Sequence, residues 1–239
     1  MIAALIIVFR EVIEAGLVIG IVLAATRGVP RSRLWIAGGI IAGVIGSLIV
    51  AGFTSAIASA FEGYGQELFN AAILGTAVVM LTWHNVWMAS HGRQMANEMR
   101  AAGEDVSAGR RSLAALAIVV GTAVLREGSE IVLFIYGIAV AGGETALGLF
   151  SGGVLGLIAG AALTALTYLG LVRIPARHLF AVTSAMIAFL AAGMASQCVA
   201  FLQQADVVTL WQDSAWDSSA LLSEGGVIGR VLHTLIGYS

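Results

Sequence analysis

Residues 2–25 read IAALIIVFREVIEAGLVIGIVLAA, an apolar stretch long enough to cross a membrane that nevertheless carries charges at its centre. About 20 apolar residues in a helix span the hydrocarbon core of a bilayer. Arg10, Glu11 and Glu14 lie in the middle of this stretch, where insertion scales assign about 3 kcal/mol to a charged side chain. A signal peptide has a basic start and an uninterrupted apolar centre, so we interpret the stretch as a retained membrane span.

The rest of the chain has the same apolar character. Of its 239 residues 59% are apolar and only 11% are charged, and the mean hydropathy is +0.96. Soluble domains carry about 25% charged residues, so this composition excludes an ordinary soluble protein, a disordered chain and a nucleic-acid binder. The 30 glycines indicate closely packed membrane helices. The single cysteine, Cys198, excludes a disulfide framework and a multi-cysteine metal site.

We predict an all-α polytopic membrane protein of six long transmembrane helices, arranged as a 3+3 inverted repeat and followed by a short C-terminal helical segment. The predicted spans are Ile2–Ala25, Leu34–Ala60, Leu68–Ser90, Leu113–Ala141, Thr145–Val172 and Leu179–Gln203. They form one integral membrane domain, residues 1–239, with a first repeat at 1–90 and a second at 113–204. Residues 91–112 are predicted as a cytoplasmic linker, and 205–239 as an extracytoplasmic acidic segment with the C-terminal helix.

Arginine decides the predicted orientation, because the chain contains no lysine. The connections after the first, third and fifth spans hold Arg27, Arg31, Arg33, Arg93, Arg100, Arg110, Arg111, Arg173 and Arg177. The positive-inside rule places these connections in the cytoplasm and the N-terminus outside, in a multi-pass protein of the cell membrane. The predicted outer face is acidic and holds Glu62, Glu67, Glu144, Asp206, Asp213, Asp217 and Glu224.

A second charged cluster interrupts the fourth span and repeats the pattern R-E-x-x-E. It comprises Arg126, Glu127 and Glu130, where the first cluster has Arg10, Glu11 and Glu14. On a helix the three charged residues of a motif lie within one 100° arc, with the arginine and the second glutamate as i,i+4 neighbours. One arginine offsets one carboxylate, so each motif keeps a surplus negative charge. Where the two spans cross near the midplane, the four carboxylates are expected to converge.

The chemistry of such a site is that of a hard cation or a proton. Carboxylate oxygens are hard ligands, and the motifs bring no cysteine or methionine pair for Cu(I). Spacing alone leaves open a proton-coupled carrier or channel for another divalent cation, such as manganese or lead. It also leaves open a non-transport scaffold in which the Arg–Glu pairs only hold helices together, although a scaffold needs no surplus charge. The chain has no ATP-binding motif or nucleophile triad, so we do not expect an enzyme.

Three further polar residues fall at helix positions with two interpretations. Glu67 and Glu144 begin outer helix ends, where an acid interacts favourably with the helix dipole or collects cations on their way in. His84 lies within the third span, either as a hydrogen-bonded buried residue or as a ligand or proton acceptor on the way out. Gly128 allows close approach of the first span or a local unwinding of the fourth.

The paired motifs resemble the high-affinity iron permeases, which include the fungal oxidase-coupled permeases and the bacterial permeases of the ferrous-uptake type. Gln66-Glu67-Leu68-Phe69, Leu81-Thr82-Trp83 and Leu190-Ala191-Ala192-Gly193 also look like stretches of that family. The resemblance implies movement of iron into the cytoplasm, as Fe(III) delivered after oxidation outside. It implies Glu11, Glu14, Glu127 and Glu130 as iron ligands, paired by Arg10 and Arg126.

By the same resemblance iron is the transported substrate and no organic cofactor is involved. The implied partners are the lipid bilayer and an extracytoplasmic iron oxidase or iron-binding protein, with no nucleic acid; a homo-oligomer stays open. The chain departs from the family in Val12-Ile13 and Gly128-Ser129, where relatives often have Gly-Leu, and in Asn70, where they often have an acid. The family usually has seven crossings, so the resemblance implies a further helix after residues 236–238, which is either truncated or absent.

Overall fold

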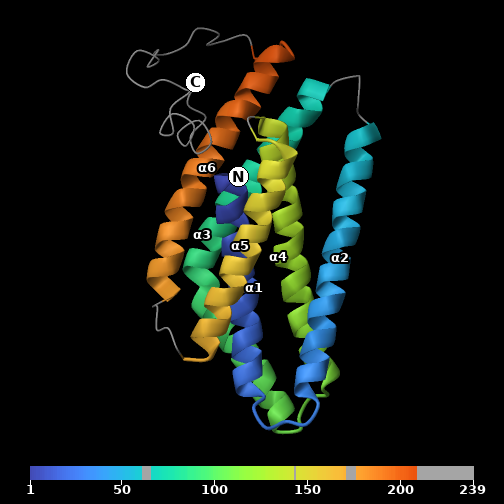
Figure 1. The fold of residues 1–239 in the computed structure, drawn as a ribbon, viewed down its shortest axis with the longest axis vertical. Helices are drawn as coiled ribbons and strands as arrows, with labels where there is room; N and C mark the ends of the chain where they lie inside the picture. Colours follow the sequence, from blue (N-terminus) through green and yellow to red (C-terminus); the bar gives the residue numbers. More distant parts are fainter. Residues whose placement is uncertain (61–65, 143, 171–175, 209–239) are drawn as a thin grey trace.

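The computed structural model describes residues 1–60, 66–142, 144–170 and 176–208, and these residues form a helical bundle (Figure 1). Within them the chain forms α1 (Ile2–Ala25), α2 (Ser32–Ala60), α3 (Gln66–Ser107), α4 (Ala114–Ala141), α5 (Ala146–Tyr168) and α6 (Ala176–Gln204). The prediction of an all-α membrane protein is confirmed. The predicted C-terminal helical segment lies outside the described residues, as do Asp213, Asp217 and Glu224.

Four of the helices are long and apolar enough to cross a membrane. These spans are Ser32–Ile57, Gln66–Met88, Ala146–Tyr168 and Ala181–Gln204. Helices α1 and α4 are of comparable length, 24 and 28 residues, but each contains the three charged residues of its motif. Their crossing of the membrane stays a prediction. It is supported by the position of α1, which packs against every other described helix.

The helices associate in three extensive pairs: α1 with α5, α2 with α4, and α3 with α6. Glycine brings the first two pairs into backbone contact. A Cβ atom added at Gly156 of α5 would lie 2.6 Å from the carbonyl oxygen of Leu5, and one added at Gly39 of α2 would lie 2.6 Å from that of Ala117. Small residues that allow such approach are typical of membrane helix interfaces. The close packing that the abundant glycine indicated is therefore seen at these two interfaces.

The pairing also bears on the predicted inverted repeat. The first helix of each half packs on the second helix of the other half, and the third helices α3 and α6 pack on each other. Exchange of the two halves would leave this pattern unchanged, as an inverted repeat requires. The repeat itself stays a prediction.

Helix α3 extends well beyond the span predicted from hydropathy. Its apolar part ends near Met88, but the helix continues through most of the predicted linker to Ser107. It ends where Gly109 adopts a positive φ of 72°, a conformation that favours glycine and commonly terminates helices. Ser107 Oγ donates a hydrogen bond to the carbonyl oxygen of Ala25 at 2.7 Å. The linker is thus largely helical and is attached to the end of α1.

Two apolar clusters divide the interior of the bundle along its length. The first apolar cluster, toward the start of α1, contains Ala3, Ile6, Ile7, Leu74, Ala77, Leu81, Phe134, Ile138, Ile187, Leu190, Ala191 and Met194. The second apolar cluster, toward the end of α1, contains Val22, Ile36, Val106, Leu116, Val120 and Val124. In the sequences of α1 and α4 the R-E-x-x-E residues fall between the members of the two clusters. The charged groups therefore lie between two apolar layers.

Candidate metal centre

The first motif forms its ion pairs within α1 and is almost completely buried. Arg10 Nη1 lies 2.9 Å from Glu11 Oε1, and Arg10 Nη2 lies 2.8 Å from Glu14 Oε1. The side chain of Arg10 is 2% exposed. The i,i+4 pair was predicted from the spacing, whereas the contact with the adjacent Glu11 was not. A guanidinium group carries five N–H donors in a planar fork, so one arginine reaches both carboxylates.

The second motif repeats this arrangement in α4 with a more open arginine. Arg126 Nη2 lies 2.5 Å from Glu127 Oε1, and Arg126 Nε lies 3.8 Å from Glu130 Oε1. The side chain of Arg126 is 40% exposed, although both glutamates are buried. Its guanidinium carbon lies 5.8 Å from the centre of the Trp87 ring, within the range of a cation–π interaction.

His84 of α3 joins the two motifs. Its Nε2 lies 3.1 Å from Glu14 Oε2, and its Nδ1 lies 2.8 Å from Glu130 Oε2. The imidazole is buried, so the histidine connects a carboxylate of α1 with a carboxylate of α4 through a third helix. The structure shows the buried histidine in contact with carboxylates, and its role as a ligand or proton acceptor stays a prediction. Its two nitrogen atoms also lie next to carboxylates of both motifs.

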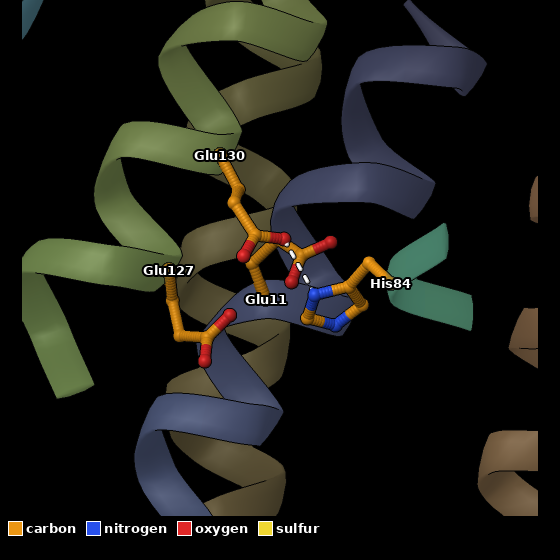
Figure 2. A group of neighbouring side chains, drawn as sticks. All are labelled: Glu11, His84, Glu127 and Glu130. Atoms are coloured by element: carbon orange, nitrogen blue, oxygen red, sulfur yellow. Dashed lines mark ion pairs between the residues drawn. The ribbon is translucent and has the colours of Figure 1, made fainter. Parts of the chain in front are cut away.

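Four side chains from three helices converge closely enough to hold one metal ion (Figure 2). Glu11, His84, Glu127 and Glu130 each offer one ligand atom, and these atoms all lie within 4.8 Å of one another. All four residues are buried. Glu14 is outside this group of four, and its oxygens contact Arg10 and His84. It still contacts the group through His84, whose Nε2 lies close to Glu14 Oε2.

Two carboxylate oxygens of this group have no polar partner among the described residues. They are Glu11 Oε2 and Glu127 Oε2, and both atoms are buried. A buried oxygen without a hydrogen bond costs about 1–3 kcal/mol or more when it is charged, so native proteins almost always satisfy such atoms. Each motif thus has one unsatisfied oxygen, on a carboxylate that belongs to the group of four, and a bound cation would satisfy oxygens of this kind.

The two predicted outer acids lie away from this cluster. Glu67 is in the first turn of α3 and is exposed. It precedes His84 by 17 positions in the same helix, which corresponds to about 25 Å along the axis. Glu144 pairs with the N-terminal amino group of Met1. Their part in collecting cations stays a prediction.

A cavity of about 370 Å³ between α3 and α4 reaches the cluster from the side. Its lining includes His84, Arg126 and Glu130 together with Met80, Trp83 and Trp87. Trp87 and this cavity were not anticipated, because a tryptophan in an apolar span gives no signal that distinguishes a cavity wall from ordinary packing. His84 was singled out, since an ionisable residue inside a span is by default of functional interest.

Gly128, between the glutamates of the second motif, allows close approach by a different helix from the one expected. A Cβ atom added there would collide with the hydroxyl oxygen of Ser47 and would lie 2.7 Å from its Cβ. Ser47 belongs to α2, not α1, and α4 is helical throughout its length. The expectation of an approach by the first span is therefore corrected, and the α4 backbone is not unwound.

Comparison with known proteins gives the family of the chain. Residues 1–239 match the model of the family described as the Iron permease FTR1 family. The chain is 30% identical over 239 residues to the ferrous iron permease EfeU of Escherichia coli O157:H7, covering 97% of this chain and 84% of the relative. It is 28% identical over 237 residues to the protein of the same name from Yersinia pestis, covering 97% and 83%. No solved structure matches the chain. With its full length matched, this chain belongs to the Iron permease FTR1 family.

Proposed function

We propose that this chain carries iron into the cytoplasm through the buried cluster between α1, α3 and α4. Membership of a permease family and the four apolar helices support a multi-pass membrane transporter. The observation that carries the assignment is the pair of buried, unpartnered oxygens, one on Glu11 and one on Glu127. They come from the two R-E-x-x-E motifs, and both carboxylates belong to the group of four that could hold one ion.

The formal charge of the cluster supports a multivalent cation. Arg10 and Arg126 contribute two positive charges, and Glu11, Glu14, Glu127 and Glu130 contribute four negative charges. The balance is minus two with a neutral imidazole, which His84 needs to bind a metal through a ring nitrogen, and minus one with a protonated imidazole, which can donate to both Glu14 and Glu130. Burial of such a surplus is costly without a counter-charge. A divalent or trivalent metal ion supplies that charge and is bound by oxygen and imidazole ligands of this type.

The individual residues have different roles in this proposal. Glu11 and Glu127 bind the ion through their unpartnered oxygens, with His84 and Glu130 completing the group of four. Glu14 holds the imidazole and becomes a ligand if His84 turns away from it. Each arginine fixes one oxygen of both glutamates in its motif and limits the repulsion among the carboxylates. Removal of a partner that orients a ligand typically costs about 10- to 100-fold in metal affinity.

The oxidation state and the delivery of iron are part of the proposal. Three carboxylates are hard ligands and favour Fe(III), so we propose uptake of Fe(III) after oxidation outside, with an extracytoplasmic oxidase or iron-binding protein as the donor. The E. coli and Y. pestis relatives are named for ferrous iron, so Fe(II) must be tested beside chelated Fe(III). A homo-oligomer is not required, since one chain supplies all of the ligands proposed here.

Iron uptake into proteoliposomes tests the proposal. Purified full-length chain would be given Fe(II) and chelated Fe(III) in separate vesicles, and internal iron would be measured over time. The double variant Glu11→Gln/Glu127→Gln keeps the shapes of the side chains and removes the two surplus charges. Glu98→Gln is the matched control, because Glu98 is an exposed carboxylate of α3 that contacts Gln94, outside the cluster.

Flux in the native chain and in Glu98→Gln, with at least about a 100-fold loss in the double variant, would support the assignment. Normal flux in the double variant would exclude this cluster as the transport site. Competition by Mn²⁺ or Pb²⁺ separates an iron permease from a carrier for another divalent cation. A scaffold would give no flux of any ion. In that case reversal of one charge in the Arg10–Glu14 pair would disrupt assembly of the protein, and reversal of both charges would restore it.

A further inference from the structure

A second cavity, unrelated to the charged cluster, opens between α1 and α5. Its volume is about 540 Å³, which is within the range of ligand sites in proteins. The wall along α1 runs from Ile13 through Leu17 and Ile21 to the end of the helix, a length of about 17 Å. Leu163 and Tyr168 of the α5 side face this wall. The cavity is therefore a long, mostly apolar slot, with Thr164 and Thr167 as the polar residues of its α5 wall and one end at the arginine-rich connections.

The end of the slot beyond α1 is basic. Arg27 and Arg100 line it, together with one acid, Glu104, and all three are exposed. The ion pairs on this face among the described residues join Arg110 and Arg111 to Asp105 and leave Arg27 and Arg100 without a carboxylate partner. Arg27 instead lies over the ring of Tyr168, 5.5 Å from its centre. Two positive charges are thus available to a ligand.

A third cavity continues this basic surface. Its volume is about 680 Å³, and it shares Arg27 and Tyr168 with the slot. Arg31 and Arg33 from the connection between α1 and α2 line it as well. Four arginines therefore surround two adjoining cavities, against one acid. A release path for a metal cation would carry the opposite charge, so this site suits an anion.

The apolar slot indicates that the anion has a hydrocarbon tail. A soluble anion would be held by the arginines alone and would leave the wall formed by Ile13, Leu17 and Ile21 unused. Basic pockets between helices at the membrane surface recognise acidic lipid head groups, and polybasic segments at that surface attract anionic lipids. We propose that an anionic phospholipid binds here, with its phosphate at Arg27 and Arg100 and an acyl chain in the slot between α1 and α5.

Lipid binding by the purified full-length chain in a neutral detergent tests this site. Native mass spectrometry would measure the dissociation constants of phosphatidylglycerol, of phosphatidylcholine with the same acyl chains, and of glycerol phosphate as the head group alone. We expect phosphatidylglycerol to bind at least about tenfold more tightly than either of the others. At roughly fivefold per arginine, Arg27→Gln/Arg100→Gln should weaken phosphatidylglycerol about 30-fold. The control Arg110→Gln/Arg111→Gln removes the same charge from the same face and should bind normally.

A second variant tests the acyl chain without changing any charge. A Cβ atom at Gly20 would meet only the Tyr168 ring, at 3.9 Å, so Gly20→Leu fits the backbone and fills the slot. Gly38→Leu on α2 is its control, because a Cβ atom there meets nothing within 4 Å. We expect Gly20→Leu to weaken the binding of phosphatidylglycerol at least tenfold and Gly38→Leu to leave this binding unchanged.

Three outcomes would overturn the inference. Equal binding of phosphatidylcholine and phosphatidylglycerol would exclude recognition of the phosphate charge. Equal binding of glycerol phosphate and phosphatidylglycerol, with no effect of Gly20→Leu, would show a site for a soluble anion. Unchanged lipid binding in Gly20→Leu together with lost iron flux in proteoliposomes would show that the slot is an aqueous path. Thermal unfolding of each variant identifies any that fail to fold, and the arginine and glycine variants are independent of each other.

Discussion

Arg10 and Arg126 occupy the same position in motifs of the same spacing, yet the side chain of Arg10 is 2% exposed and that of Arg126 is 40% exposed. Each contacts both glutamates of its own motif. The difference arises outside the motifs. Helices α1 and α4 both pack against every other described helix, but α4 meets α3 at a cavity lined by Trp83 and Trp87, and Arg126 lines this cavity too. Local spacing thus fixes the ion pairs, and the neighbouring helices fix the solvation of the arginine.

The largest expected effect of this difference is on stability. Arg10→Gln leaves Glu11 and Glu14 buried without their cation, and loss of one partner of a buried ion pair costs about 3–5 kcal/mol. The free energy of unfolding, measured by chemical unfolding in detergent, should fall by that amount. A loss below about 1 kcal/mol would mean that water or another group already solvates these carboxylates.

The next largest effect is expected on iron affinity, where Glu11 of the first motif is compared with Glu127 of the second. Glu11 and Glu127 each carry one unpartnered oxygen, so the single variants Glu11→Gln and Glu127→Gln should lose iron affinity equally, despite their different arginines. We expect about 100-fold for each, equivalent to about 2.7 kcal/mol. Dissociation constants from competition with a chelator in detergent would measure this. A loss confined to one motif would show that the two do not share an ion, and Glu98→Gln serves again as the control.

The smallest effect is expected at Arg126. Its guanidinium group borders the cavity between α3 and α4, so water can reach Glu127 and Glu130 once the arginine is removed. Arg126→Gln should therefore lower the free energy of unfolding by about 1 kcal/mol or less, as for partly exposed ion pairs. The same unfolding assay measures it beside Arg10→Gln. Equal losses in the two variants would contradict the assigned difference in burial.

Much of the bundle was predictable because the position of a membrane span follows from the local amino-acid composition. The apolar runs gave the helix positions, and the 100° rotation per residue gave the pairs Arg10–Glu14 and Arg126–Glu130. The continuation of α3 to Ser107 was not predicted, because hydropathy reports where the apolar surface ends, not where the helix ends. Its polar last turns are held by contact with the end of α1.

The contacts between helices could not be derived from the same patterns. His84 is 70 positions from Glu14, and nothing in the spacing of either residue indicates that their side chains meet. The approach of Ser47 to Gly128 is similar, since a glycine permits contact without selecting the partner helix. The sequence therefore singled out residues that the structure brings together in the cluster. It did not indicate that an imidazole would connect the two motifs.

The glycine contacts of the bundle have a mechanical consequence. They hold α1 against α5 and α2 against α4 by backbone contact, while the motifs face each other across the boundary between these two pairs. We expect each pair to move as one rigid body, so spin labels on α1 and α5 should keep their separation on iron binding while labels on α1 and α2 change theirs. A motion of this kind changes the distance between Glu11 and Glu127 and leaves the glycine contacts within each pair intact. Iron capture and release would then involve a rotation of the α1–α5 pair relative to the α2–α4 pair, with the charged cluster at their boundary.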